Sequence, residues 1–155
     1  MKPIKIFSIL LMLCLGIATV ATAQPAAVKK AANTTFTLTT FDAKGSILST
    51  SNGVFVSNNG ICVSTWKPFV GAMKAEVTDN NGQKYSVETI LGANELYDVA
   101  KFKVTAKTNA ALFAPSVVAN SAAWIVMLSQ AGDPIKANID KVEKFMTKYN
   151  YCVLS

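Results

Sequence analysis

The sequence of 155 residues contains no histidine, and this one absence removes whole classes of catalysis. Imidazole is the side chain whose ordinary pKa suits proton exchange near neutral pH, so neither a Ser-His-Asp triad nor a Cys-His pair can form. Zinc and iron sites that use histidine are excluded for the same reason, and three cysteines are too few for a four-thiolate site. We therefore expect no metal, no cofactor and no histidine-based enzyme activity.

Arginine is also absent, so each of the 15 basic side chains is a lysine. The net charge is +6 at pH 7, but the lysines are scattered along the chain and do not alternate with aromatic residues. Nucleic-acid recognition favours arginine, whose planar guanidinium binds phosphate or guanine through two hydrogen bonds. The composition therefore argues against a nucleic-acid partner.

The sequence also lacks a glycine-rich phosphate loop, a Gly-x-Ser-x-Gly turn and the acidic spacing of a calcium loop. Five acidic residues in the middle of the chain could in principle converge as a carboxylate pair, namely Glu76, Asp79, Glu88, Glu95 and Asp98. Without a supporting motif, we interpret them as solvated charges on turns and strand faces.

The first 23 residues have the pattern of a cleavable export signal. Lys2 and Lys5 form a short basic start, residues 6–20 are almost entirely apolar, and Ala21-Thr22-Ala23 places small residues where a signal peptidase reads them. The apolar run is shorter than the roughly 20 residues that cross a bilayer, which argues against an uncleaved anchor. We predict cleavage between Ala23 and Gln24, a periplasmic or secreted protein, and no membrane attachment afterwards.

Alternation of apolar and polar residues dominates the rest of the chain. Residues 24–33 are alanine-rich without a consistent period, and we interpret them as a flexible leader. From Thr34 onward the period of two predicts strands, around Phe36 and Leu38 and then over residues 46–57, 61–65, 74–79, 84–91 and 98–104. A further apolar run over residues 122–128 is typical of a fully buried strand. The tail is ambiguous, because residues 138–149 have helical spacing whereas residues 149–153 alternate.

Two Asn-Gly pairs indicate hairpins. Asn58-Asn59-Gly60 and Asn80-Asn81-Gly82 each lie between predicted strands, and Asn-Gly suits two-residue turns that need positive φ. A third turn is expected at residues 42–45, and a short irregular or helical link at residues 66–72. The pattern as a whole predicts antiparallel β structure.

Two cysteines, Cys62 and Cys152, remain after cleavage of the signal, in a compartment that permits disulfides. Both lie in apolar, alternating stretches. They are interpreted either as two buried free thiols or as a Cys62–Cys152 disulfide, because the sequence does not place their Cα atoms within bonding range.

Several short motifs occur in a characteristic order. Ser51-Asn52-Gly53-Val54-Phe55-Val56 is followed by Asn59-Gly60, Cys62-Val63-Ser64-Thr65, Phe69-Val70-Gly71-Ala72, Asn81-Gly82 and Leu96-Tyr97-Asp98-Val99-Ala100-Lys101-Phe102. Over about residues 34–132, these motifs resemble the first barrel of trypsin-like serine proteases of the HtrA type. The resemblance implies an all-β fold, with a first antiparallel barrel over residues 34–120 and the start of an incomplete second barrel over residues 121–155.

The resemblance also places the family's catalytic residues on this chain. Asp98 stands at the position of the triad aspartate, and the histidine position falls on Lys67, or on Trp66 if the alignment shifts by one residue. Lysine has a reference pKa of about 10.4 and is protonated at pH 7, so a Lys67–Asp98 ion pair is expected in place of a catalytic pair. The nucleophile loop is missing as well, because Ser46 comes too early and Ser155 has no flanking glycine.

Three functions remain open at this point. The first is an exported, non-catalytic trypsin-like domain or fragment, a pseudoprotease that binds a polypeptide or another protein domain at an open sheet edge. The alternative is a fragment of a secreted trypsin-like serine endopeptidase whose nucleophile lies in a missing C-terminal half. A third interpretation is a structural envelope protein held by its neighbours.

Overall fold

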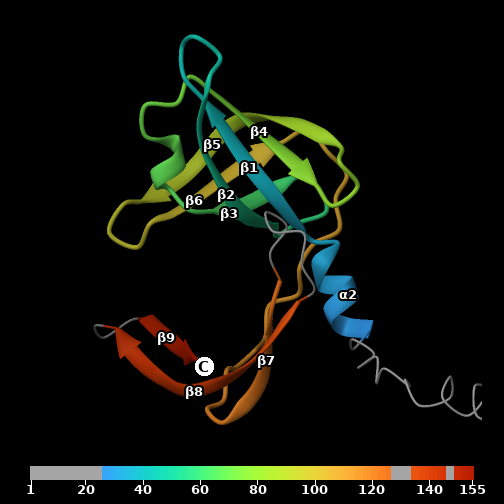
Figure 1. The fold of residues 1–155 in the computed structure, drawn as a ribbon, viewed down its shortest axis with the longest axis vertical. Helices are drawn as coiled ribbons and strands as arrows, with labels where there is room; N and C mark the ends of the chain where they lie inside the picture. The colour runs from blue at the N-terminus through green and yellow to red at the C-terminus, as the bar shows by residue number, and fades with distance from the viewer. Residues whose placement is uncertain (1–25, 127–133, 146–148) are drawn as a thin grey trace, which may run out of the picture.

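The computed structural model describes residues 26–126, 134–145 and 149–155. The predicted signal peptide and its cleavage site, Ala23 and Gln24, lie outside these residues. Within the described ranges the chain forms a closed six-stranded barrel and a separate three-stranded sheet (Figure 1). No helix in this part of the chain is long and apolar enough to span a membrane.

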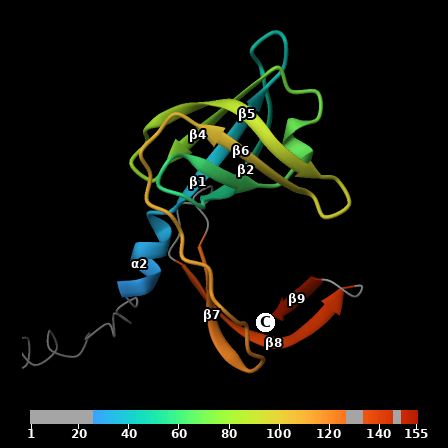
Figure 2. The same cartoon turned by 180° about the vertical axis from the view of Figure 1, so that it is seen from behind.

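The barrel is antiparallel throughout. Its strands are β1 (Thr35–Phe41), β2 (Ile47–Phe55), β3 (Ile61–Ser64), β4 (Lys74–Asp79), β5 (Lys84–Asn94) and β6 (Val99–Val104). They close in the order β1-β2-β3-β6-β5-β4, so that β3 pairs with β6 and β1 pairs with β4 (Figure 2). A 3₁₀ turn, η1 (Lys67–Phe69), follows β3. The predicted all-β antiparallel fold is confirmed.

Alternation along the strands fills the inside of the barrel. β1 buries every second residue, and Phe36 and Leu38 are fully enclosed. The Phe36 ring contacts Phe55 at a centroid distance of 4.8 Å and Phe102 at 6.0 Å. Each such side chain contributes about 1.5–3 kcal/mol when it is buried, so these aromatic contacts hold strands β1, β2 and β6 together.

The β4–β5 turn is one residue longer than the Asn-Gly pattern predicts. At the β4–β5 turn the Gly82 N–H donates to the Asp79 carbonyl at 3.0 Å, and among the described residues of this turn only Gly82 has positive φ, at 78°. This is a three-residue loop with a left-handed glycine, not the predicted two-residue turn. The Asp79 carboxylate accepts the N–H groups of Asn81 and Gln83, at 2.8 and 2.9 Å, which favours the longer loop.

A short helix, α2 (Ala26–Ala32), occupies most of the segment predicted to be a flexible leader. Alanine has the highest intrinsic helix propensity, and Val28 on this helix is buried. The helix ends where the Thr34 hydroxyl donates to the Ala31 carbonyl at 2.7 Å. The prediction of an irregular leader is therefore wrong for these residues.

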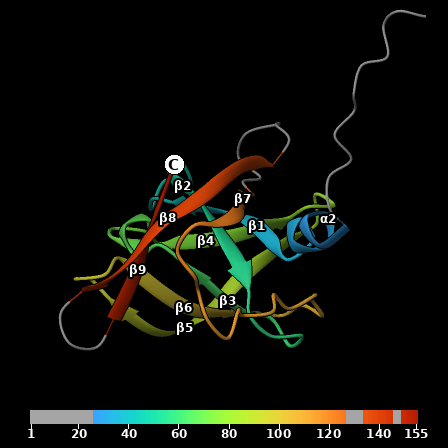
Figure 3. The same ribbon diagram turned by 90° about the horizontal axis from the view of Figure 1, so that it is seen from below.

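The second sheet is a meander of β7 (Ser121–Ile125), β8 (Ile135–Phe145) and β9 (Tyr149–Leu154). Residues 105–120 connect it to the barrel, and it lies below the barrel in the view of Figure 1 (Figures 1 and 3). Among its described side chains only Ala137 is buried. The prediction of a fully buried strand over residues 122–128 is wrong for residues 122–126, whose side chains are half-buried or exposed. Residues 127 and 128 lie outside the described part of the chain. The helical alternative for the tail is also wrong, since β8 and β9 pair as strands.

Candidate functional site

Asp98 occupies an unusual backbone position at the entry to β6. Its φ is 50°, and its N–H donates to the Glu95 carbonyl at 3.2 Å. The preceding residue, Tyr97, donates its N–H to the Asn94 side-chain oxygen at 3.1 Å. Asp and Asn tolerate this left-handed conformation better than other non-glycine residues, so the turn itself favours an Asp at this position.

The Asp98 carboxylate is used to hold the chain segment that follows β3. Its Oδ1 accepts the backbone N–H of Trp66 at 3.0 Å and that of Lys67 at 2.8 Å. Hydrogen bonds to a charged acceptor are stronger than those between neutral groups. Asp98 therefore fastens η1 to the β5–β6 turn across 31 residues of sequence.

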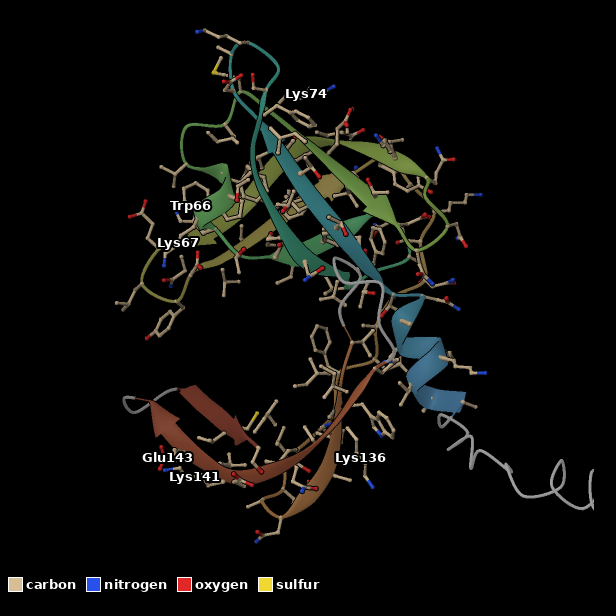
Figure 4. The ribbon with its side chains drawn as sticks, viewed as in Figure 1. Trp66, Lys67, Lys74, Lys136, Lys141 and Glu143 are labelled. Atoms are coloured by element: carbon tan, nitrogen blue, oxygen red, sulfur yellow. The ribbon has the colours of Figure 1, made fainter. Side chains whose placement is uncertain are left out.

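The two candidates for the histidine position differ in their surroundings. Trp66 is half-buried, packs against the barrel core and stacks on Phe69 at a centroid distance of 6.1 Å. Lys67 is exposed (Figure 4). Trp66 is thus part of the packing, and Lys67 is the residue that faces solvent beside Asp98.

The expected ion pair between Lys67 and Asp98 does not form. In the described ranges the ion pairs are Lys74–Glu76 and Lys141–Glu143, and Asp98 is bonded to the Lys67 backbone, not to its ammonium group. The Asp98 Oδ1 atom instead receives the backbone N–H groups of Trp66 and Lys67, and the Lys67 side chain is exposed. The structure therefore brings Asp98 and Lys67 together but gives them a backbone contact.

A pair of hydroxyl groups that the sequence analysis missed lies on the neighbouring strands. The Ser51 and Ser64 oxygens are 3.0 Å apart, and the buried Ser64 hydroxyl also donates to the Asn52 carbonyl at 2.7 Å. Nothing in the sequence pattern marks these serines, since Ser64 is one polar residue in an alternating strand. The two hydroxyls bond to each other and to a carbonyl, which cannot act as a general base.

The other serines considered as nucleophiles are both exposed. The Ser46 N–H donates to the Asp42 carboxylate at 2.8 Å in the β1–β2 turn, and the Ser155 hydroxyl donates to the Asp140 carboxylate at 2.7 Å. Ser46 is therefore part of a turn, and Ser155 belongs to the end of the three-stranded sheet.

Both cysteines are free thiols. Cys62 is fully buried in the barrel, where its thiol lies 3.5 Å from the Gly60 carbonyl, and burial raises its pKa to about 12. Cys152 is exposed on β9. The structure contains no Cys62–Cys152 disulfide, since both thiols are free. The other alternative, two buried free thiols, holds for Cys62 and not for Cys152. No group of three or more acidic or cysteine side chains that could hold a metal occurs among the described residues.

Comparison with known proteins identifies the fold. No family profile and no curated protein sequence matches this chain. Among solved structures, HtrA-type protease AlgW with a tripeptide superposes with a TM-score of 0.65 at 16% identity, covering 79% of this chain and 41% of that one. A variant of AlgW, also with a tripeptide, gives 0.65 at 15% identity over 81% of this chain and 44% of the other. The chain spans about two-fifths of the length of these proteases, and it has their trypsin-like fold.

Proposed function

We propose that this chain is an exported, non-catalytic trypsin-like domain that binds extended polypeptide. The observation that carries the non-catalytic part is the arrangement at Asp98. Its carboxylate accepts two backbone N–H groups, and the neighbouring side chain at the histidine position is the exposed Lys67. With no histidine in the sequence, no imidazole is available to take a proton from a nucleophile.

Lys67 is a poor replacement for that imidazole. A lysine becomes a base near neutral pH only when burial or a neighbouring cation lowers its pKa by several units. Lys67 is exposed and therefore lacks the burial that such a base needs. This exposure supports a domain that retains the trypsin-like scaffold without its chemistry.

The polypeptide-binding part of the proposal rests on strand edges. The barrel is closed, so its strands pair on both sides, whereas β7 and β9 each pair only with β8 in the described part of the chain. A free edge presents unpaired N–H and C=O groups to which an extended peptide can add as another strand. Addition of an unfolded polypeptide should slow amide hydrogen exchange in β7 or β9 and leave β1–β6 unchanged. Equal protection of both sheets would contradict edge binding.

Export is proposed from the first 23 residues, with cleavage between Ala23 and Gln24 and a periplasmic or secreted location. Intact-mass measurement of the protein recovered outside the cytoplasm should show the loss of residues 1–23. Retention of Met1 in that fraction would contradict the proposal.

The second candidate is a piece of a trypsin-like serine endopeptidase. The length comparison favours it, because this chain covers only 41% and 44% of the protease chains that it matches. Extending the reading frame downstream distinguishes the two candidates. A Gly-x-Ser-Gly-Gly motif some 50 or more residues further on would support the endopeptidase, although Lys67 would still oppose it.

Activity assays test the main proposal directly. The purified exported chain should neither cleave unfolded casein nor react with a fluorophosphonate probe above a blank. Lys67→His should not restore either reaction, because a base without an activated serine has no proton to accept. Hydrolysis by Lys67→His that disappears in Lys67→His/Asp98→Ala would show that a nucleophile is present and that the proposal is wrong.

A further inference from the structure

Two lysines are fixed on the outer face of β6 by the alternation of that strand. Ala100, Phe102 and Val104 are fully buried, so Lys101 and Lys103 between them point outward. They lie two positions apart on one face, and their Cα atoms are therefore about 7 Å apart.

Among the described residues, no ion pair joins these lysines to the strands beside β6. Lys103 pairs with Ile61 on β3 and Thr89 on β5. Lys101 pairs with Val63 and Gly92, so no acidic residue stands directly opposite either lysine. The ion pairs of the described ranges involve Lys74 and Lys141 and none of the lysines of this region.

An open groove of about 810 Å³ continues from the end of β6. The β6 groove, as it is called below, is formed by the β2–β3 turn and the segment after β6, that is, by residues 58–59 and 103–109. Lys103 and Lys107 line it together with Asn, Thr and small residues, and no carboxylate or aromatic side chain is found among the described residues of the lining.

Hydrogen bonds hold both walls of the β6 groove in place. Across the groove, the Val104 N–H donates to the Gly60 carbonyl at 2.9 Å, and the Thr108 N–H donates to the Asn58 carbonyl at 3.2 Å. The Thr108 hydroxyl donates to the Ser57 carbonyl at 2.8 Å. The groove is thus a fixed junction between the β2–β3 turn and the chain that leaves the barrel.

The same network engages the side-chain oxygens of both asparagines. The Asn58 side-chain oxygen accepts the Ala110 N–H at 3.1 Å, and the Asn59 side-chain oxygen accepts the Ser57 hydroxyl. Both acceptor oxygens are therefore engaged within the protein, and the two NH₂ groups remain as donors. Two amide donors and two ammonium groups in one groove form an environment suited to carboxylates.

We propose that the β6 groove binds an acidic segment of a polypeptide through the side-chain carboxylates of that segment. Three features favour this partner over other polyanions. The described lining of the groove has no aromatic side chain on which a nucleobase could stack, and the chain has no arginine to bind phosphate with two hydrogen bonds. Nor does that described lining contain a large exposed apolar side chain that could enter a lipid surface. The site lies on the barrel, and it is independent of binding at the edges of the three-stranded sheet.

A single isosteric substitution tests the proposal. Asn58→Asp keeps the oxygen that accepts the Ala110 N–H but replaces the outward NH₂ with negative charge. Fluorescence anisotropy of a labelled decaglutamate peptide on the exported chain should show binding that Asn58→Asp weakens about tenfold. Asn81→Asp, at the exposed tip of the β4–β5 turn, changes the net charge equally and should leave binding within about twofold.

A lysine pair provides the second arm. The double variant Lys103→Ser/Lys107→Ser should weaken decaglutamate binding about tenfold. Each exposed ion pair that is lost accounts for a factor of up to about five. Lys44→Ser/Lys84→Ser removes the same charge from exposed positions outside the groove and should have little effect. Equal loss in both double variants, or in Asn58→Asp and Asn81→Asp, would show attraction by net charge alone and overturn the site.

Competitors distinguish the class of partner. Decathymidylate and vesicles containing phosphatidylglycerol should fail to displace labelled decaglutamate at equal anionic charge. Displacement by either at matched concentration would overturn the assignment to an acidic polypeptide. Unchanged unfolding midpoints for all variants would show that the losses reflect the groove and not the fold, whereas a loss of binding that tracks unfolding would count against it.

Discussion

The barrel and the three-stranded sheet are built from the same kind of strand but bury their side chains to different degrees. In β1 alternate residues are fully enclosed, whereas in β7 the side chains are half-buried or exposed. The barrel closes on itself, so the inward faces of its strands cover one another. The sheet forms one layer, and Ile135 on β8 remains 52% exposed. Alternation thus produces a core only where a second face meets the first.

The segment between the two regions resembles the sheet in leaving large apolar side chains exposed. Leu112 is 88% exposed and Phe113 is 75% exposed in the described structure. On the barrel side, the same segment is anchored by the Ala111 N–H, which donates to the Phe55 carbonyl at 2.8 Å. Removal of a large apolar side chain should therefore lower the free energy of unfolding strongly in the barrel and only slightly in the sheet.

The largest effect is expected from truncation in the barrel core. Phe102→Ala should lower the free energy of unfolding by about 3–5 kcal/mol, because it removes contacts to Phe36 and Phe69 and leaves a cavity. Ile135→Ala in the sheet should cost less than about 1 kcal/mol. Urea unfolding followed by tryptophan fluorescence and circular dichroism gives both values. Comparable losses would contradict the difference between the regions.

A second test concerns the glycine turns of the barrel. A Cβ on Gly60 would lie 2.1 Å from the Val104 carbonyl oxygen, and its φ is 81°, so Gly60→Ala should cost about 2–4 kcal/mol. Gly45→Ala is the matched control, because its φ is 80° and nothing lies within 4 Å of its Cβ. It should cost about 1–2 kcal/mol. Equal unfolding midpoints for the two variants would show that the contact with Val104 is unimportant.

The link between η1 and the β5–β6 turn gives a smaller effect. Asp98→Ala removes the acceptor for two N–H groups and places alanine at a φ of 50°, which should cost about 1–3 kcal/mol. Asp98→Asn retains an acceptor oxygen and tolerates this φ, so less than about 1 kcal/mol should be lost. If Asn is as destabilising as Ala in urea unfolding, the contribution of Asp98 is its charge and not its geometry.

The reactivities of the two thiols provide a comparison of the barrel with the three-stranded sheet that involves no change in stability at neutral pH. Cys152 should react with a thiol reagent in the native protein, and Cys62 should react only after unfolding, because it is fully buried and its pKa is about 12. Labelling followed by peptide mass analysis identifies the modified residue. Rapid native labelling of Cys62 would show that the barrel opens readily.

The raised pKa of Cys62 also predicts a pH dependence. Above the unfolded value of 9.0 the unfolded chain loses the thiol proton while the folded chain keeps it, up to about pH 12. Stability should therefore be unaffected by this group below pH 9 and should fall as the pH rises beyond it. The fall should be less steep in Cys62→Ala than in the parent chain, as measured by urea unfolding at pH 7, 9 and 10. Parallel slopes would contradict the assignment.

Most strands of the barrel were predictable because buried and more exposed residues alternate along β1, β3, β4 and β6. The core residues Phe36 and Leu38 follow from the same pattern. The form of the Asn-Gly turns did not, since the Asp79 carboxylate selects a longer loop through contacts with backbone N–H groups. The exposure of β7 was not predicted, because an apolar run does not reveal whether another layer covers it. The tail was left open between helix and strand, and the pairing of β8 with β9 decided for strand.

What the amino-acid sequence alone determines is the chemistry that is available: a chain without histidine has no imidazole, whatever its fold. Tertiary structure decided which groups meet. It joined Asp98 to the backbone of Lys67 across 31 residues, separated Cys62 from Cys152, and placed Asn58 beside Lys103 and Lys107 in one groove. Local periodicity reports which face of a strand is apolar, but contacts between distant segments depend on barrel closure and strand register, which no local pattern contains.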